Sequence, residues 1–269
     1  VVRLTAGSVN ELRRHADQLQ SAGIRSYEAD FPPADLLLME HRVHGSVTVT
    51  GVAAAGRHVD LVFINPGLAR SGWEPALEVL SVDIETNPKS DEILAIGLVS
   101  NGVWNEKANE VHLLRAEAGP QVRGRSVDNH PWIIEHPSEK SLLEAFVRRV
   151  NGIDPDIITG WNVVDFDMAV ISRRLSHHRI PFSITRSDHS AQFLPASRDD
   201  YGRRQNAGVS CHGRQVIDGL RLLRYGPERF SDRKLDSVAR AVLGEGKTVT
   251  AETSRDKIET LLLLYRNDP

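Results

Sequence analysis

Two acidic residues interrupt an apolar segment of this 269-residue chain in a pattern that a β-strand would arrange on one face. Residues 79–86 read Val-Leu-Ser-Val-Asp-Ile-Glu-Thr. Because strand side chains alternate, the apolar residues would enter a core while Asp83 and Glu85 point together the other way. Two neighbouring like charges on a central strand are unfavourable unless something neutralises them, and a divalent cation does so. The alternative is an exposed edge strand with two solvated acids.

A second acidic segment follows about 80 residues later, at Asp154–Asp167. The β-branched run 157–159 predicts a short strand, and Gly160 would end it or let another backbone come close. A helix is expected next, with Asp167 in its first turn, where the helix dipole favours a carboxylate. From there Asp167 could reach Asp83. Taken alone, an acid at a helix start needs no function.

Taken together, the two segments are specific. The strand sequence Asp-Ile-Glu-Thr, followed by Gly-Trp-Asn-x-x-x-Phe-Asp at 160–167, resembles the first two exonuclease motifs of the family B DNA polymerases. Those motifs belong to the DEDD class of 3′→5′ proofreading exonucleases. The resemblance covers nearly the whole chain, is weakest in 41–76 and 186–210, and is closest to bacterial members of the family. Further matches lie at 26–30, 38–40, 216–219, 235–239 and 243–247.

The resemblance implies a ribonuclease H-like exonuclease fold and a two-metal site for Mg²⁺ or Mn²⁺. Asp83 is interpreted as the ligand that bridges both metals, Asp167 as a ligand of one, and Glu85 as a ligand of the metal that activates the attacking water. Candidates for shaping the site are Asn162, Phe166 and Asp218. The family's third motif, a Tyr followed four residues later by Asp, is not present, since Tyr265 and Asp268 are only three apart. We therefore expect a fragment truncated before that motif, with impaired nuclease activity.

The predicted fold class is α/β, a mixed sheet flanked by helices and preceded by a small α+β domain. Residues 1–76 are expected to be part of the polymerase N-terminal domain, and residues 77–269 the truncated exonuclease domain. In the first part we expect helices and strands at 8–20 (helix), 24–29 (strand), 33–40 (helix), 47–52 and 59–64 (strands), with a linker from Pro66. In the second part we expect an antiparallel meander of three strands at 79–84, 93–100 and 110–114. Further strands are expected at 157–159 and 216–218, and helices at 138–150, 167–175, 235–243 and 258–265. A long loop or hairpin is expected at 186–213.

Charge and cysteine content bound the remaining possibilities. The chain has 33 Lys and Arg against 36 Asp and Glu, so its composition gives no overall signal for nucleic acid. One local basic strip could follow a phosphate backbone or be ordinary solvated surface: Arg203, Arg204, Arg214, Arg221, Arg224, Arg229, Arg233 and Lys234. Cys211 is the single cysteine, which excludes internal disulfides and cysteine-based zinc sites and indicates a reducing cytoplasm. The resemblance implies association with a bacterial nucleoid.

Three functions stay open. The first is a fragment of a DNA-directed DNA polymerase that carries the proofreading 3′→5′ exonuclease. The second is a stand-alone DEDD-type exonuclease acting on DNA or RNA, and the third is a non-catalytic ribonuclease H-like module that binds nucleic acid or protein. For the first, the resemblance implies three partners: a single-stranded DNA 3′ end, a primer-template in the full-length protein, and a sliding clamp bound through an absent C-terminal part.

Overall fold

The structure is a computed structural model that describes residues 2–29, 31–103, 107–115, 125–127, 130–198 and 204–246. The chain divides into two compact units, residues 1–75 and 76–269, and each is described by itself. The helix predicted at 258–265 lies outside the described residues. No helix in the described part of the chain is long and apolar enough to cross a membrane.

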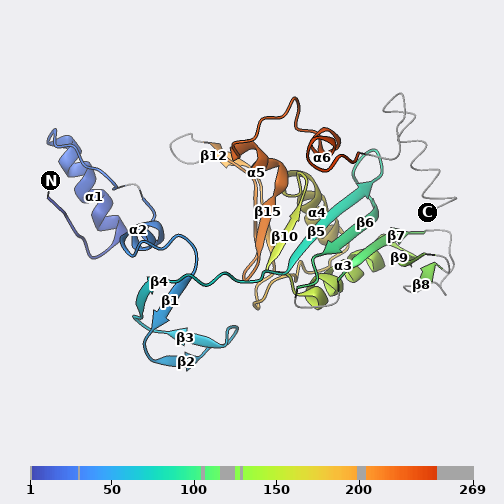
Figure 1. Cartoon of the computed structure of the whole chain (residues 1–269), viewed down its shortest axis with the longest axis horizontal. Coiled ribbons are helices and arrows are strands. Elements are labelled where there is room, and N and C mark those ends of the chain that lie inside the picture. Colours follow the sequence, from blue (N-terminus) through green and yellow to red (C-terminus); the bar gives the residue numbers. More distant parts are fainter. Residues whose placement is uncertain are drawn as a thin grey trace. The chain divides into compact units, whose positions relative to one another are not determined.

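The first unit contains two helices and two antiparallel strand pairs (Figure 1). These are α1 (Val9–Ser21), α2 (Pro33–Glu40), β1 (Val47–Thr50) with β4 (Gly67–Arg70), and β2 (Ala53–Ala55) with β3 (Leu61–Phe63). Ser8 caps α1 by accepting a hydrogen bond from the Glu11 amide, as the sequence predicted. The strand predicted at 24–29 is wrong, because the Ile24 amide closes the end of α1 by donating to the Leu19 carbonyl at 2.8 Å.

The second unit is built on a seven-stranded mixed sheet in the order β15-β10-β5-β6-β7-β9-β8 (Figure 1). The predicted antiparallel meander is confirmed for β5, β6 and β7, and β10 lies parallel to β5 and to β15. The strands β8 and β9 were not predicted, and β9 runs parallel to β7. The bounds are β5 (Val79–Thr86), β6 (Ile93–Ser100), β7 (Asn109–Leu114), β8 (Arg125–Val127), β9 (His130–His136), β10 (Ile157–Gly160) and β15 (Gln215–Asp218).

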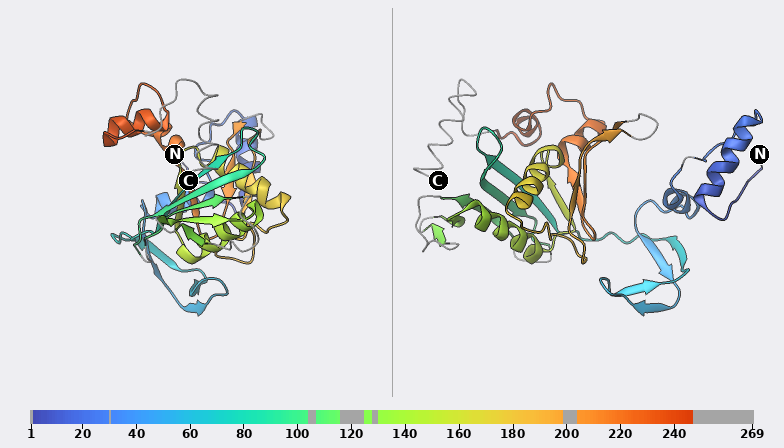
Figure 2. Two further views of the ribbon diagram at one scale, coloured as in Figure 1. Left: turned by 90° about the vertical axis from the view of Figure 1, so that its right-hand side faces the viewer. Right: turned by 180° about the vertical axis from the view of Figure 1, so that it is seen from behind.

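Helices α3 (Glu139–Ile153) and α4 (Ala169–His177) cover one face of this sheet and lie next to each other (Figure 2). The apolar residues of β5 enter the core beneath them, as the alternation predicted. Glu139 ties the two helices together, since its carboxylate accepts hydrogen bonds from Arg174 at 2.5 Å and from His178 at 2.7 Å. The mixed sheet and its helices confirm the predicted α/β class.

The C-terminal part of the described chain consists of short strands and two helices, of which the first directly follows β15. The segment 186–213 forms a hairpin, one of the two forms predicted, from β11 (Gln192–Leu194), β12 (Ser197–Arg198), β13 (Arg204–Gln205) and β14 (Gly208–Ser210). The helices α5 (Gly219–Tyr225) and α6 (Leu235–Leu243) follow, and α5 was not predicted. One residue of the proposed basic strip was misassigned. Arg214 is buried and donates to the Ile184 carbonyl at 2.7 Å and to Asp154 at 2.7 Å, so it is a structural residue.

Candidate functional site

The candidate site forms where β10 stops and β5 continues. The two strands pair in parallel only from Val79 to Ser81, and β10 ends at Gly160. A Cβ at position 160 would lie 2.4 Å from the Val82 carbonyl oxygen, so the close approach requires glycine there. This confirms the reading of Gly160 as a point where another backbone comes close. Beyond it, no strand of the described chain pairs with this edge of β5.

A π-helical turn, η1 (Val164–Met168), fills that edge. Asp167 lies in this turn, whereas the sequence predicted the first turn of an α-helix. Its Oδ1 accepts a hydrogen bond from the Ile84 amide at 3.0 Å, which satisfies a strand donor that β10 no longer reaches. Single π-turns within helices are frequently found at functional sites. The turn places the Asp167 carboxylate against β5 between the two acids of the strand.

Asp167 is destabilised as an anion. Burial raises its pKa, the neighbouring charge of Asp83 raises it further, and the hydrogen bond from Ile84 only partly opposes them, so its pKa is about 7. The charge of Asp218 acts in the same direction. Asp167 and Asp83 are therefore close enough to repel, and a carboxylate pair of this kind is stabilised by a proton or by a cation.

The third predicted ligand, Glu85, shares the exposed face of β5 with Asp83, as the alternation predicted. Within the described ranges, however, no three His, Cys, Asp or Glu side chains are grouped closely enough to hold a metal ion. The donor set nevertheless fits a hard divalent cation, because it consists of carboxylate oxygens in mutual repulsion. The structure thus brings Asp83 and Asp167 together, while the part of Glu85 in a ligand set stays a prediction.

Asp218 holds the site together from the end of β15. It is 4% exposed, and its Oδ2 accepts a hydrogen bond from the Val164 amide at the start of η1 at 3.1 Å. Its Oδ1 accepts from the Arg221 amide at 3.1 Å and so caps α5. One carboxylate thereby connects β15, η1 and α5, which supports the prediction that Asp218 shapes the site.

Arg221 is a site-supporting residue that the sequence did not single out for this role. Its guanidinium forms two bonds with Asp165 of η1, at 2.7 and 3.2 Å, and donates to the Ala207 carbonyl at 2.6 Å. Its Nε also lies 3.9 Å from Asp218. Arg221 was assigned to a basic strip, but these contacts make it a brace of the π-turn. Its hydrogen-bond partners Ala207 and Asp165 are 14 and 56 residues away, so no local pattern could have revealed these two contacts.

The other two candidates lie at the entrance to η1. Asn162 has a left-handed backbone with φ 61°, and its carbonyl accepts a hydrogen bond from the Phe166 amide at 3.0 Å. Asn tolerates this conformation better than most residues, so Asn162 shapes the turn through its backbone. The side chain of Phe166, directly before Asp167, is 38% exposed and is available to a ligand.

Fold and site define an α/β domain in which the paired acids Asp83 and Asp167 lie at one end of a mixed sheet. Residues 24–238 match the family model described as DNA polymerase family B, exonuclease domain. This match includes β5, η1 and β15, and it spans well over half of the chain. The chain therefore belongs to the family B DNA polymerases.

Individual relatives agree with this assignment. DNA polymerase II of Escherichia coli (strain K12) is 30% identical over 241 residues, which is 89% of this chain and 28% of that protein. The DNA polymerase catalytic subunit of Alcelaphine herpesvirus 1 (strain C500) is 27% identical, over 92% of this chain and 26% of its own. The family B DNA polymerase structure from the archaeon Pyrobaculum calidifontis has the same fold, with a TM-score of 0.59 at 19% identity, covering 98% of this chain and 33% of that one. The chain thus spans about a quarter to a third of the length of these relatives.

Proposed function

We propose that this chain carries the 3′→5′ exonuclease of a family B DNA polymerase of the DNA polymerase II type, and that it removes 3′-terminal nucleotides from DNA. The observation that carries the proposal is the placement of Asp167 against the acidic strand. The Asp167 carboxylate accepts a hydrogen bond from the amide of Ile84, which lies between Asp83 and Glu85, and burial together with the charge of Asp83 raises its pKa. These residues are also the ones that match the family's first two exonuclease motifs.

The metal of this proposal is Mg²⁺ or Mn²⁺, held by Asp83 and Asp167 with Glu85 as a further ligand. When bound, such an ion neutralises charge on the phosphodiester and lowers the pKa of a coordinated water. The chain's own groups fix the ligands: the Ile84 amide orients Asp167, while Asp218 and Arg221 hold the π-turn that carries it. Phe166 is exposed beside Asp167 and could stack on the terminal base.

The substrate of this proposal is a single-stranded DNA 3′ end. Several exposed cations of the basic strip follow η1 along the chain and could contact the phosphate backbone: Arg204, Arg224, Arg229, Arg233 and Lys234. Polymerase activity on a primer-template, binding of a sliding clamp, and a bacterial cytoplasmic location near the nucleoid belong to the same proposal. The polymerase activity rests on the longer relatives, which are named DNA polymerases and of which this chain spans a minor part, whereas the clamp and the location rest on the family resemblance alone.

One observation favours a second candidate, a non-catalytic module that binds nucleic acid. No group of three metal-ligating side chains is assembled in the described part of the second unit. Such a module would need neither Asp83 nor Asp167 for binding. The two candidates therefore differ in whether the acids hold a cation.

The test has two measurements. Calorimetric titration measures Mn²⁺ binding, and gel analysis of a 5′-labelled single-stranded oligonucleotide measures its shortening. We expect Mn²⁺ to bind the wild-type chain and to support weak stepwise shortening from the 3′ end. Asp83→Ala should remove both, since it leaves Asp167 without its neighbouring ligand. Glu144→Gln, a partly exposed acid on α3, is the matched control and should retain Mn²⁺ binding. Mn²⁺ affinity that is equal in the wild type and Asp83→Ala would overturn the proposal and favour the non-catalytic module.

A further inference from the structure

The face of the sheet opposite α3 and α4 carries a strip of uncharged residues next to Asp83. The strand register places Gly97 of β6 directly opposite Asp83, and Val111 of β7 opposite Gly97. In the adjoining row, Val99 of β6 lies opposite Asn109 of β7. Residues that are paired in this way share one face of a sheet. We call the four residues Gly97, Val99, Val111 and Asn109 the β6–β7 strip.

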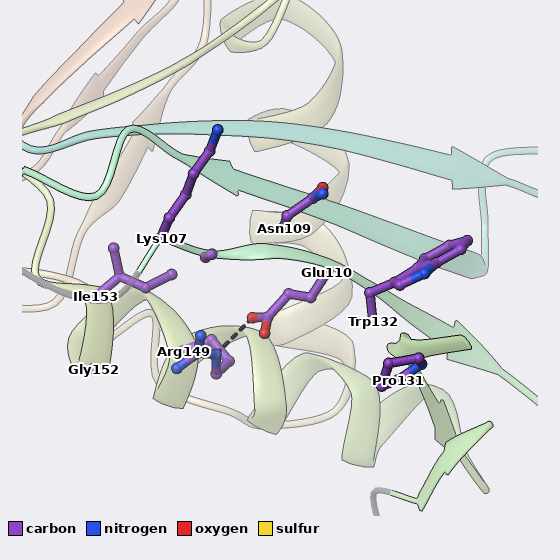
Figure 3. A pocket seen from close by; sticks show the side chains of 9 residues that line it. Lys107, Asn109, Glu110, Pro131, Trp132, Arg149, Gly152 and Ile153 are labelled. Atoms are coloured by element: carbon purple, nitrogen blue, oxygen red, sulfur yellow. Dashed lines mark hydrogen bonds and ion pairs between the residues drawn. The ribbon is translucent and has the colours of Figure 1, made fainter. Parts of the chain in front are cut away.

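The β6–β7 strip is accessible, and it ends in a polar side chain. Val99 is 45% exposed and Asn109 is exposed, whereas Gly97 is half-buried. Figure 3 shows Asn109 on the opposite side of β7 from Glu110, which points toward Arg149 of α3. The strip is therefore separate from the buried Glu110 network, and its outer end offers an amide that can both donate and accept hydrogen bonds.

Gly97 is not explained by the packing or the backbone of the described chain. A Cβ at position 97 would meet only the Asp83 carbonyl oxygen there, at 3.8 Å, which is an ordinary contact. Its φ lies outside the left-handed range. Gly160, on the other side of β5, is different, because packing excludes a side chain there. A glycine inside a strand weakens the strand and often marks a place that a ligand approaches closely.

The missing side chain leaves space beside the acidic site. Directly opposite residues of an antiparallel pair have Cβ atoms about 4.5–5.5 Å apart, so a larger residue at position 97 would stand next to the Asp83 carboxylate. The glycine instead keeps the surface low between Asp83 and the exposed Val99. A ligand held at Asp83 could therefore extend over β6 toward β7.

The order of groups along this path matches that of a nucleotide. The strands β5 and β7 are two strand spacings apart, roughly 10 Å, which is close to the length of a nucleotide from its phosphate to the far edge of its base. A cation at Asp83 would neutralise the phosphate. The sugar would then lie over Gly97, and the base would reach the apolar Val99 and the amide of Asn109, which can pair with the polar edge of a base.

We propose that the β6–β7 strip seats the 3′-terminal nucleotide, with the sugar over Gly97 and the edge of the base against Val99 and Asn109. The proposal rests on the proposed nuclease function, because Asp83 and its cation fix the phosphate. Gly97 is then a specificity-determining residue, since the nucleotide fits only where no side chain stands. The strip contacts the edge of the base, so the flat face of the base stays available to Phe166.

The test is calorimetric titration of the 269-residue chain, in saturating Mn²⁺, with deoxyadenosine 5′-monophosphate, which has no phosphodiester bond to cleave. The matched ligand is 2-deoxyribose 5-phosphate, which lacks the base and should bind several times more weakly. Gly97→Val should weaken binding of the nucleotide about tenfold or more, as for an added side chain in a fitted site, and should retain Mn²⁺ binding. Asn109→Ala should weaken it roughly twofold to tenfold, as for one hydrogen bond, and leave the sugar phosphate unaffected.

Gly152→Val is the matched control, because an added Cβ in this last turn of α3 also meets a single atom at 3.8 Å, and it should bind both ligands as the wild type does. Nucleotide binding that is no tighter than that of the sugar phosphate, or that is unchanged in either strip variant, overturns the proposal. Loss of Mn²⁺ binding in Gly97→Val also overturns it, since the glycine would then serve the metal. If thermal melting shows that Gly97→Val is unfolded, Gly97→Ala takes its place.

The same titrations separate this proposal from the nuclease function on which it rests. Mn²⁺ that binds the wild type but not Asp83→Ala, together with a nucleotide that ignores the strip, overturns only the seat of the nucleotide. Mn²⁺ that binds the wild type and Asp83→Ala equally overturns both.

Discussion

Asp167, in η1 against β5, and Glu110, in β7, are carboxylates at two places on the same sheet, and their pKa values are shifted in opposite directions. Burial favours the protonated form of both. At Glu110, hydrogen bonds from His112 and Arg149 overcome burial and lower the pKa to about 2. At Asp167, the neighbouring charges of Asp83 and Asp218 add to burial and raise the pKa to about 7.

The difference lies in what each carboxylate faces. Glu110 has a guanidinium 2.6 Å away, so its negative charge is already balanced within the protein. The groups that shift the pKa of Asp167 are two further acids and two backbone amides, so the fold supplies like charge there. Buried ions are normally paired or bound to metals. The comparison shows that the fold leaves the negative charge of Asp167 beside further acids, whereas at the β7 end it supplies a cation for Glu110.

The largest expected effect is that of Asp167→Asn, which keeps an acceptor for the Ile84 amide but removes the charge. The native wild type holds a proton on Asp167 up to about pH 7, whereas the unfolded chain releases it near pH 4. The wild type therefore loses stability as pH rises from about 4 to about 7. We expect the variant to be more stable at pH 8 by as much as about 4 kcal/mol, with no difference near pH 4.

Urea unfolding in EDTA, at several pH values, measures this difference. Addition of Mn²⁺ at pH 8 should stabilise the wild type but not the variant, because only the wild type has a charged Asp167 carboxylate that can bind the ion. Glu144→Gln, a partly exposed acid on α3, is the control. A wild type that is the more stable protein at pH 8 without metal would show that Asp167 is not strained by its neighbours.

His136, which belongs to the hydrogen-bonded network of Glu110, should give the free energy of unfolding a pH dependence opposite in sign to that from Asp167. Burial, and then the charges of His112 and Arg148, lower its pKa to about 4. Its contribution to stability is fully present above about pH 6.5 and is lost as pH falls toward 4, since the unfolded chain takes up the proton first. The loss should amount to at most about 3 kcal/mol.

His136→Gln, which retains a polar group for His112, should remove this part of the acid dependence. The measurement is the free energy of unfolding between pH 7 and pH 4 for the wild type and the variant, with His41→Gln in the first unit as the control. Profiles of the same slope for the wild type and His136→Gln would mean that the network tolerates a proton.

Gly160→Ala tests whether the acidic end depends on the close approach of β10 to β5. The added Cβ would lie 2.4 Å from the Val82 carbonyl oxygen and 3.1 Å from the Val163 Cβ, so backbone must move. We expect destabilisation of about 1–3 kcal/mol, as for overpacking elsewhere. Gly208→Ala, where an added Cβ meets nothing within 4 Å, is the matched control. Wild-type stability in Gly160→Ala would show that β5 and β10 adjust freely.

The sequence predicted those features of the site that depend on residues close together in the chain. The alternation of Asp83 and Glu85 along β5 and the close approach at Gly160 were predicted, because both are encoded within a few residues. The nearness of Asp167 to β5 was also anticipated, with the family resemblance as a guide. These features recur wherever a strand ends at a glycine and the chain turns back across the neighbouring strand.

The features that were missed depend on distant partners. The strand β9 pairs with β7 through residues about 22 positions apart, and its sequence has polar residues at both ends. The predicted strand at 24–29 had suitable residues, but no neighbouring strand pairs with it in the described chain. The π-turn and the bracing role of Arg221 arise only after β15 and η1 have come together. Local patterns contain none of this information.

Arg221→Met should have the smallest effect on stability and the most specific effect on the acidic site. Asp165 is 43% exposed, so its ion pair with Arg221 contributes little, and we expect a loss of about 1 kcal/mol. Asp218 is different, because it is buried and lies 3.9 Å from the guanidinium. Without that positive charge, Asp218 repels Asp167 more strongly, and the pKa of Asp167 rises further above its usual range.

A proton then competes more effectively with a cation for Asp167, so the pH of half-maximal Mn²⁺ binding should move upward in Arg221→Met. Arg221→Lys, which retains the charge but not the bidentate contact with Asp165, should restore most of this pH profile. A change confined to stability would mean that Arg221 only braces the turn. A shift in the pH profile that Arg221→Lys reverses would instead mean that Arg221 controls how much negative charge the acidic end presents to a cation. Arg149 does the same for Glu110, but by direct contact.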